Sequence, residues 1–351
     1  MSIAKKPFGV LTDGRSVEQY TLTNKLGASV SVITFGGILT SIQVPDSKGH
    51  LGEVTLGFDE LPPYLTKNGS LGALIGRYGN RIAKGQFALD GKTYQLAVNN
   101  GKNHLHGGNV GFGVRLWEAE PKENKGADQL LLRLVSPDGE ENYPGKLTVE
   151  VTYTFDDACA LSIHYRAVTD KPTVLNLTNH AYFNLAGADG RTVLNHELTL
   201  FGDAITETDE GLIPTGKLLP VDGTAFDFRT PRVIGEGLKA GETDIALQYG
   251  KGYDHNYVLG NPFVTKKCAL LKDPVSGRVM EVTTDQPAVQ FYTANQQGIP
   301  GRNGAYYGPQ CALCLETQHY PDSPNHANFP STVLRPGEIF ESLTTYAFRA
   351  E

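Results

Sequence analysis

Short segments in which polar and apolar residues alternate, each followed by a turn signal, run through most of this chain. The clearest is residues 147–155, where Val149, Val151, Tyr153 and Phe155 fall on one face and polar residues on the other. A period of two is typical of a strand with one face in a core. With 40 glycines and 20 prolines, both above ordinary usage, turns should be frequent and helices few. The sequence therefore predicts an all-β fold, a large β-sandwich with some closed or curved sheet.

Other elements follow from the same patterns. Further strands are predicted at residues 29–34, 38–44, 130–135, 161–168 and 289–293. Gly36-Gly37 predicts a tight turn or bulge between the first two, and Asp90-Gly91 a two-residue hairpin. The best short helix is residues 58–65, which Pro62-Pro63 limits to about one turn. Residues 214–232, rich in Pro, Gly and Asp, are predicted to form a long surface excursion.

The chain shows no internal repeat, no low-complexity segment and no change in composition that would mark a linker. We therefore expect a single domain over residues 1–351, as a monomer or weak dimer. No run of 18 apolar residues suggests a membrane span, and a net charge of −7 argues against nucleic-acid or anionic-membrane partners.

The four cysteines are Cys159, Cys268, Cys311 and Cys314, too few and too irregularly spaced for a disulfide framework. Reduced thiols and an N-terminus without a signal-peptide pattern indicate a cytoplasmic protein, although an exported form with its leader removed would look the same.

Residues 174–185 separate two kinds of surface. The even positions carry Asn176, Thr178, His180, Tyr182 and Asn184, while the odd positions are apolar apart from one asparagine. This alternation predicts a strand whose second face is polar but uncharged, which suits a hydroxyl-rich, uncharged ligand such as a sugar. An imidazole with a pKa near its reference value of about 6.5 can transfer protons at neutral pH. The strand alone supports equally well a core histidine satisfied by neighbouring amides.

Two further polar segments precede this one. Asn80 and Arg81 lie in a glycine-flanked stretch, Gly76 to Gly85, where the backbone and a ligand could approach closely. The alternative for Arg81 is an ordinary surface arginine. His104 and His106 are two positions apart, so on a strand they would face the same way.

Three candidates follow in the second half of the chain. Asp254 lies among aromatic residues and suits a diol, although a turn aspartate that caps its own backbone is as common. Gln290 and Tyr292 share a strand face. Glu316 is the lone carboxylate in an apolar run, where desolvation should raise its pKa and make it a better base near neutral pH.

Five segments together resemble the galactose mutarotase (aldose 1-epimerase) family, in the same order over almost the whole chain. They are Gly-Arg-Tyr-Gly-Asn80-Arg81-Ile-Ala-Lys-Gly, Asn-His-Leu-His106-Gly-Gly, Leu-Thr-Asn-His180-Ala-Tyr-Phe-Asn-Leu, Tyr-Asp254-His-Asn and Cys-Leu-Glu316-Thr-Gln. Asn142 departs from the family, in which glycine is frequent at this position, but asparagine also tolerates a left-handed backbone.

The resemblance implies an elongated β-sandwich that interconverts the anomers of a free aldohexose without a cofactor or metal. It implies that Glu316 is the general base, that His180 is the general acid and that His106 assists and contacts the sugar. The resemblance further implies that the sugar hydroxyls are held by Asn80, Arg81, Asp254 and Gln290, with Tyr182 beside the acid. Opening and closing a pyranose ring needs only proton transfers, which one acid and one base supply.

Three alternatives stay open. A cupin-like metalloenzyme would use His104, His106, His180 and Glu316 as ligands, but the cupin motif places a glutamate shortly after the second histidine, and Gly107-Gly108 follows here. A non-catalytic carbohydrate-binding sandwich would explain the polar strand but not the acid and base. An epimerase of hexose 6-phosphates would need more basic residues than the five segments offer.

The Cys311-x-x-Cys314 pair is a poor metal or redox signal, because residues three apart on a strand face opposite ways. Cys314 shares a face with Glu316, so it is a candidate for the floor of the pocket.

Overall fold

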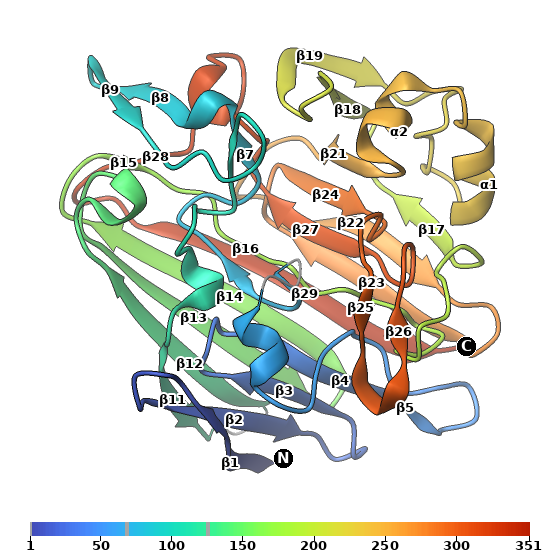
Figure 1. Ribbon diagram of the computed structural model, residues 1–351. Helices are drawn as coiled ribbons and strands as arrows, with labels where there is room; N and C mark the ends of the chain where they lie inside the picture. Colours follow the sequence, from blue (N-terminus) through green and yellow to red (C-terminus); the bar gives the residue numbers. More distant parts are fainter. Residues whose placement is uncertain (1, 67–69, 124–126) are drawn as a thin grey trace.

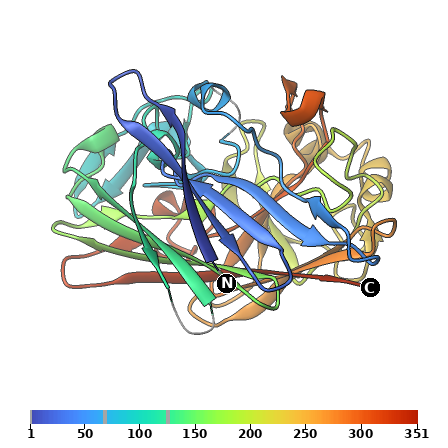
Figure 2. The ribbon, with the colours of Figure 1, turned by 90° about the horizontal axis from the view of Figure 1, so that it is seen from below.

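The computed structural model describes residues 2–66, 70–123 and 127–351 and is built almost entirely of strands. One layer is a nine-stranded antiparallel sheet, and two five-stranded sheets form the opposing layer (Figures 1 and 2). This arrangement confirms the predicted all-β sandwich. The α-helices of the described residues are short, α1 (Ile234–Ala240) and α2 (Ile245–Gly250). Neither of these helices nor any other described helix is long and apolar enough to cross a membrane.

The nine-stranded sheet joins the two halves of the chain. Its order is β11 (Glu118–Lys122), β12 (Ala127–Ser136), β13 (Leu147–Asp156), β14 (Ala160–Thr169), β29 (Phe340–Ala350), β23 (Arg278–Thr284), β22 (Lys266–Lys272), β17 (Glu197–Leu200) and β20 (Arg232–Val233). The C-terminal strand β29 lies between β14 and β23, so mid-chain and late strands share one sheet. Burial alternates at every residue of β13, as the period of two predicts. The single domain stays a prediction, which this continuous sheet supports.

The N-terminal sheet follows chain order: β1 (Ser2–Val10), β2 (Ser16–Thr23), β3 (Ser29–Ile33), β4 (Leu39–Pro45) and β5 (Leu51–Glu53). The strands predicted at residues 29–34 and 38–44 are confirmed, with a register shift at Ser31 and Val32. Gly36 has a φ of +66°, and a Cβ there would lie 2.3 Å from the carbonyl oxygen of Gly113. Only glycine therefore fits this turn.

The third sheet has the order β19 (Pro214–Pro220), β18 (Ala204–Thr208), β21 (Asp254–Val258), β24 (Ala288–Tyr292) and β27 (Cys314–Gln318). One buried apolar cluster includes residues of all three sheets, for example Val30, Val149 and Phe291. The third sheet is therefore fixed against the same core as the others, which gives the side chains on its other face a rigid support.

Residues 174–185 do not form one strand, so that prediction is wrong. The segment contains only β15 (Thr173–Val174), β16 (Thr178–Asn179) and isolated bridges, and all twelve residues are buried. Asn176 donates to the carbonyl of Gly79, and Asn184 to that of Cys311. The segment runs through the interior, so its polar positions are mostly covered by protein rather than presented on one open face.

The prediction of a surface excursion at residues 214–232 is also wrong in part. Strand β19 pairs with β18, and Phe226 and Phe228 are buried in the core because they pack beneath the third sheet. The predictions at residues 58–65 and at Asp90-Gly91 are confirmed: Pro62–Leu65 forms one 3₁₀ turn, and β8 (Gln86–Leu89) and β9 (Lys92–Gln95) form a hairpin.

Candidate active site

A pocket of about 370 Å³ opens over the third sheet and collects residues from distant parts of the chain. Its walls are Ser70, Asn80, Arg81, Asn100, Leu105, His106, His180, Tyr182, Asp254, Tyr292, Gln296, Gln297, Gly298, Ile299 and Glu316. Most of these side chains are polar and uncharged. Seven of the eight predicted site residues line this one pocket, and the eighth, Gln290, donates to the carboxylate of Asp254 at 2.6 Å.

The floor of the pocket is set by the register of three strands. Gln290 of β24 lies opposite Glu316 of β27, and Tyr292 lies opposite both Asp254 of β21 and Cys314 of β27. Residues directly opposite each other in an antiparallel pair share a face, as do residues two apart on one strand. The acid of β21, the amide of β24 and the acid of β27 therefore lie on one surface.

One wall is formed by the short pair β7 (Arg81–Ile82) and β10 (His104–Leu105). His106 follows β10 with a φ of +51°, and its Nδ1 accepts the backbone N–H of Asn80 at 3.1 Å. The prediction that His104 and His106 face the same way is wrong, because the backbone turns after Leu105. His104 is buried instead, with Nδ1 2.7 Å from the Ala97 carbonyl and Nε2 2.6 Å from the Tyr143 hydroxyl.

Arg77, in the same glycine-flanked stretch, is 2% exposed. Its guanidinium donates to the hydroxyl and the carbonyl of Ser136 and to the carbonyl of Pro144, away from the pocket. The pocket cation from this stretch is Arg81, whose Nη1 lies 3.7 Å from Oδ2 of Asp254. Arg81 and Asp254 are thus a loose pair, in which both groups keep hydrogen-bonding capacity for a ligand.

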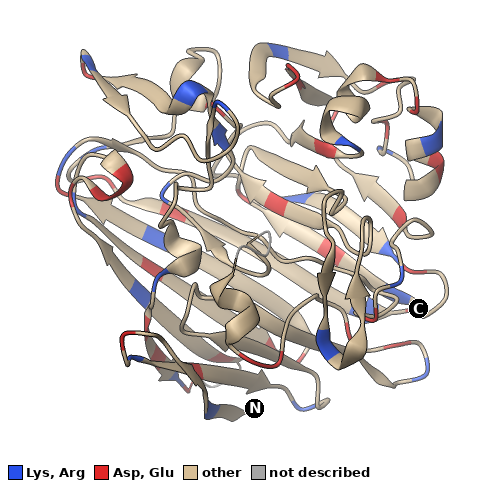
Figure 3. Cartoon of the chain, in the orientation of Figure 1, with Lys and Arg blue, Asp and Glu red and all other residues tan. Residues whose placement is uncertain are grey.

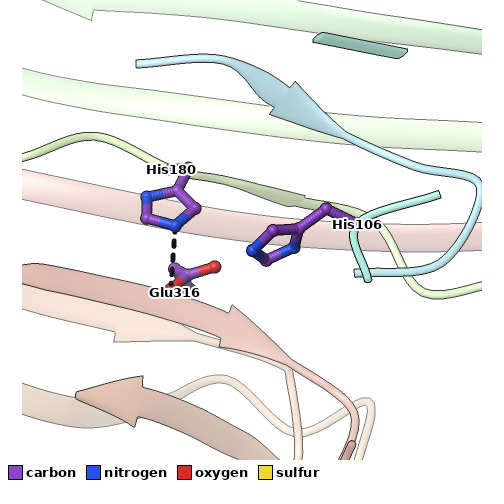
Figure 4. A group of neighbouring side chains, drawn as sticks. All are labelled: His106, His180 and Glu316. Atoms are coloured by element: carbon purple, nitrogen blue, oxygen red, sulfur yellow. Dashed lines mark ion pairs between the residues drawn. The ribbon is translucent and has the colours of Figure 1, made fainter. Parts of the chain in front are cut away.

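His180 and Glu316 meet at the centre of the pocket. Nε2 of His180 lies 3.6 Å from Oε1 of Glu316, with His106 beside both (Figure 4). The His180 ring stacks on Tyr182 at 4.9 Å and meets His106 edge-on at 5.2 Å. The imidazole plane is therefore fixed by aromatic contacts, and the carboxylate approaches one ring nitrogen.

Burial shifts both members of this pair toward their neutral forms. Desolvation lowers the pKa of His180 to about 4. Desolvation, and secondarily the charge of Asp254, raises the pKa of Glu316 well above its ordinary value. At a pH between the lowered pKa of His180 and the raised pKa of Glu316, the pair holds one proton. It therefore does not bind a second proton at neutral pH. Desolvation and the neighbouring His180 likewise lower the pKa of His106 well below its ordinary value.

Five polar lining residues were not predicted: Ser70, Asn100, Tyr292, Gln296 and Gln297. Tyr292 carried a signal, because it was expected to share a face with Gln290. The other four lie in loops whose polar composition is that of any surface loop. Nothing in their sequence indicates that tertiary structure brings them to one pocket.

The two histidines of the pocket and Glu316 could also hold a metal ion. The ligand atoms of His106, His180 and Glu316 all lie within 4.8 Å of one another. Zinc ligands bond at about 2.0 to 2.2 Å, so these side chains would need to move closer together to coordinate it. His104, the fourth ligand of the cupin alternative, faces Tyr143 outside the pocket.

Three comparisons with known proteins point to one family. A family model described as aldose 1-epimerase matches residues 18–347. A galactose mutarotase of Mus musculus is 44% identical over 351 residues, which cover 99% of each chain. An aldose 1-epimerase of Escherichia coli is 39% identical over 343 residues, 97% of each chain. The crystal structure of a galactose 1-epimerase from Lactobacillus acidophilus matches with a TM-score of 0.87 at 27% identity, over 99% of each chain. This chain belongs to the aldose 1-epimerase family.

Proposed function

We propose that this chain is an aldose 1-epimerase that interconverts the α and β anomers of free aldohexoses such as galactose and glucose. The observation that carries the proposal is the His180–Glu316 pair, 3.6 Å apart and almost fully buried in a pocket of hydrogen-bonding side chains. A carboxyl and an imidazole that share one proton are the acid and base that ring opening needs.

Ring opening begins with the proton of the pair on His180. Glu316 removes the proton of the anomeric hydroxyl while Nε2 of His180 gives its proton to the ring oxygen, so the C1 to ring-oxygen bond breaks and an aldehyde forms. The pair again holds one proton, now on Glu316. After rotation about the C1 to C2 bond, the two groups exchange roles and the ring closes on the other carbonyl face. No net proton is gained or lost.

The pKa shifts support this cycle. The form that burial favours, a neutral Glu316 and a neutral His180, is the form the pair has while the sugar is open. In the charged form of the pair, Glu316 is ionised and His180 is protonated, and burial destabilises both charges. Glu316 is therefore a stronger base, and protonated His180 a stronger acid, than the same groups in water.

His106 is assigned a supporting role. Because its Nδ1 accepts the Asn80 N–H, the proton of the neutral ring lies on Nε2. This nitrogen is a neutral hydrogen-bond donor beside His180, suited to the ring oxygen or the anomeric oxygen. Asn80, Arg81 and Asp254 supply donors and acceptors for the sugar hydroxyls.

Gln290 and Tyr182 are assigned to the support of these groups. The amide of Gln290 orients the Asp254 carboxylate and leaves that carboxylate free lone pairs for hydroxyl groups. Tyr182 stacks on the acid and closes the pocket behind it.

An uncharged sugar fits the pocket better than a sugar phosphate. Arg81 is the only Lys or Arg among the described lining residues, and the acids Asp254 and Glu316 lie opposite it. Along the chain, the positions of Lys or Arg and of Asp or Glu are interspersed (Figure 3). A phosphate normally requires several donors of positive charge, so hexose 6-phosphates are disfavoured.

We also propose that the protein is cytoplasmic, since all four cysteines are buried free thiols. We further propose that it is a monomer or a weak dimer.

Polarimetry tests the function. Freshly dissolved α-D-galactose and α-D-glucose should reach anomeric equilibrium faster in the presence of the purified protein, without added metal or nucleotide. Binding of the sugar with only the buffer-catalysed rate would instead support a carbohydrate-binding protein.

A further inference from the structure

The guanidinium of Arg81 is held only loosely by its side-chain contacts. Its Nε lies 3.3 Å from the amide oxygen of Asn100, and its Nη1 lies 3.7 Å from Oδ2 of Asp254. Both distances exceed the length of a well-formed N–H···O bond, about 2.9 Å. The place of this guanidinium in the pocket therefore depends on how firmly the backbone of β7 is held.

The two edges of β7 meet different parts of the chain. Toward β10, the Asn80 carbonyl accepts the N–H of His106 at 3.2 Å. Consecutive residues of a strand direct their backbone groups to alternate edges, so the Arg81 carbonyl and the Ala83 N–H point away from β10. Asp322 meets both of these groups. Its N–H donates to the Arg81 carbonyl at 2.8 Å, and its Oδ1 accepts the Ala83 N–H at 2.9 Å. Asp322 thus acts as a strand partner whose carboxylate replaces a backbone carbonyl.

The carboxylate of Asp322 is buried and oriented by further contacts. Its Oδ1 also accepts the side-chain amide of Asn325 at 2.6 Å, and the same amide donates to the Gln86 carbonyl at 2.9 Å. Its Oδ2 lies 3.3 Å from Nε2 of His326. A carboxylate oxygen has two lone pairs, so Oδ1 can serve Asn325 and Ala83 together.

The segment that contains Asp322 also carries the proposed base. It continues from β27, which holds Glu316 and ends at Gln318, and it lies beside β7 (Figure 1). Strand β27 is in turn paired with β24. One continuous segment therefore fixes Glu316 on the floor of the pocket and reaches across to the strand that carries Arg81 on its wall.

We propose that Asp322 is a positioning residue for sugar binding, which closes the second edge of β7 and so holds the Arg81 guanidinium in a fixed place relative to Glu316. This inference rests on the proposed role of Arg81 in holding the sugar hydroxyls. Asp322 is absent from the described residues that line the pocket, so it acts through Arg81 and not on the sugar.

Asp322→Gly is the variant that tests the inference. Asp322 has a φ of +57°, which glycine adopts without strain. The change keeps the backbone N–H that bonds Arg81 and removes only the acceptor for Ala83. Polarimetry should show a KM for galactose raised about tenfold, the size expected when a hydrogen bond from a charged donor is weakened. The value of kcat should stay near that of the wild type, since the His180–Glu316 pair is not altered.

Two further variants separate positioning from general stability. Asp322→Asn should keep the wild-type KM, because asparagine tolerates the same backbone and its amide oxygen can accept the Ala83 N–H. Asp273→Gly is the matched control. Asp273 is equally buried, and its carboxylate accepts the Ser276 N–H at 2.8 Å in the turn between β22 and β23. Asp273→Gly should lower the unfolding temperature and leave KM unchanged.

A double variant shows whether Asp322 acts through Arg81. Asp322→Gly combined with Arg81→Met should have nearly the KM of Arg81→Met alone, because the group that Asp322 positions is already gone. A wild-type KM in Asp322→Gly, or two effects on KM that multiply in the double variant, would overturn the inference.

Two measurements do not depend on turnover. Amide hydrogen exchange of the wild type needs no variant, and rapid exchange of the Ala83 N–H would also overturn the inference. Calorimetric titration with galactose distinguishes it from the proposed function. A wild type that binds galactose without accelerating mutarotation would refute the function, while weaker binding by Asp322→Gly would still support the role of Asp322. Equal affinity of the two proteins would refute that role.

Discussion

Oε1 of Glu316 lies 3.6 Å from Nε2 of His180, while Oε2 of Glu316 is buried without a hydrogen-bond partner among the described residues. A buried carboxyl with an unsatisfied oxygen costs stability, and such groups are retained where function needs them. The strand that carries Glu316 pairs with β24 and packs Leu315 into the core, so these contacts offset the cost.

We therefore expect Glu316→Gln and His180→Asn each to lower kcat by about 10² to 10⁴, the usual contribution of one proton-transfer group. Thermal unfolding of Glu316→Gln should occur at the same or a higher temperature than in the wild type, because an amide avoids the cost of protonating a buried carboxyl that is ionised in the unfolded chain. Polarimetry and calorimetry on the same samples separate the two effects. Turnover near the wild-type rate in either variant would show that the acid and base are assigned to the wrong residues.

The one-proton pair predicts a bell-shaped dependence of kcat/KM on pH. Activity should fall as the pH drops toward about 4, where His180 and Glu316 together bind a second proton. It should fall on the alkaline side as the pair loses its only proton, above the ordinary range of a glutamate because the pKa of Glu316 is raised.

Asp254→Asn provides the check on this assignment. The negative charge of Asp254 helps to raise the pKa of Glu316, so the variant should move the alkaline limb to lower pH. An alkaline limb that stays in place, while KM rises through lost sugar contacts, would mean that another group sets it.

Metal ions should inhibit this protein rather than activate it. Dialysis against a chelator should leave the rate unchanged, because the proposed cycle needs only proton transfers. Added Zn²⁺ should slow the reaction in competition with the sugar, since His106, His180 and Glu316 can converge on one ion. His106→Asn should weaken that inhibition. Loss of activity on chelation, restored by a divalent metal, would instead favour the metalloenzyme alternative.

The sequence predicted the site better than the segments that carry it. Family resemblance predicted that the motifs around four residues meet at one site: Arg81, His180, Asp254 and Glu316. The long strands β12, β13 and β14 followed from alternation alone. Residues 174–185 show the limit of such patterns. Alternation reports the polarity of each face, whereas what covers the polar face depends on elements far away in the chain.

Local backbone geometry set a second limit. The period of two places His104 and His106 on one face only if the strand continues, and the positive φ of His106 ends it. The pocket residues Gln296 and Gln297 were missed because their loop is placed by a contact distant in sequence. Arg302, five residues beyond Gln297, makes that contact, although Gly-Arg-Asn-Gly reads as an exposed turn.

Arg302 anchors the hairpin of β25 (Ile299–Pro300) and β26 (Tyr306–Tyr307), which carries one wall of the pocket. Its Nη1 lies 2.9 Å from Oε2 of Glu53 in the N-terminal sheet, and its Nε donates to the Gly57 carbonyl at 3.2 Å. Both side chains are largely buried.

Arg302→Met should therefore destabilise the protein by about 3 to 5 kcal/mol, because it leaves the Glu53 carboxylate buried without its cation. It should also raise KM more than it lowers kcat, since the wall at Gln297 and Ile299 loosens while the His180–Glu316 pair stays in place. Denaturant unfolding and polarimetry measure the two effects.

The double variant Arg302→Met, Glu53→Gln should cost less than the sum of the single changes, because the two residues are in contact. Arg349→Met, which breaks an exposed pair with Glu351, is the control and should cost little stability, because solvent screens such a pair. A similar small cost for Arg302→Met, with an unchanged KM, would show that the hairpin does not depend on this anchor.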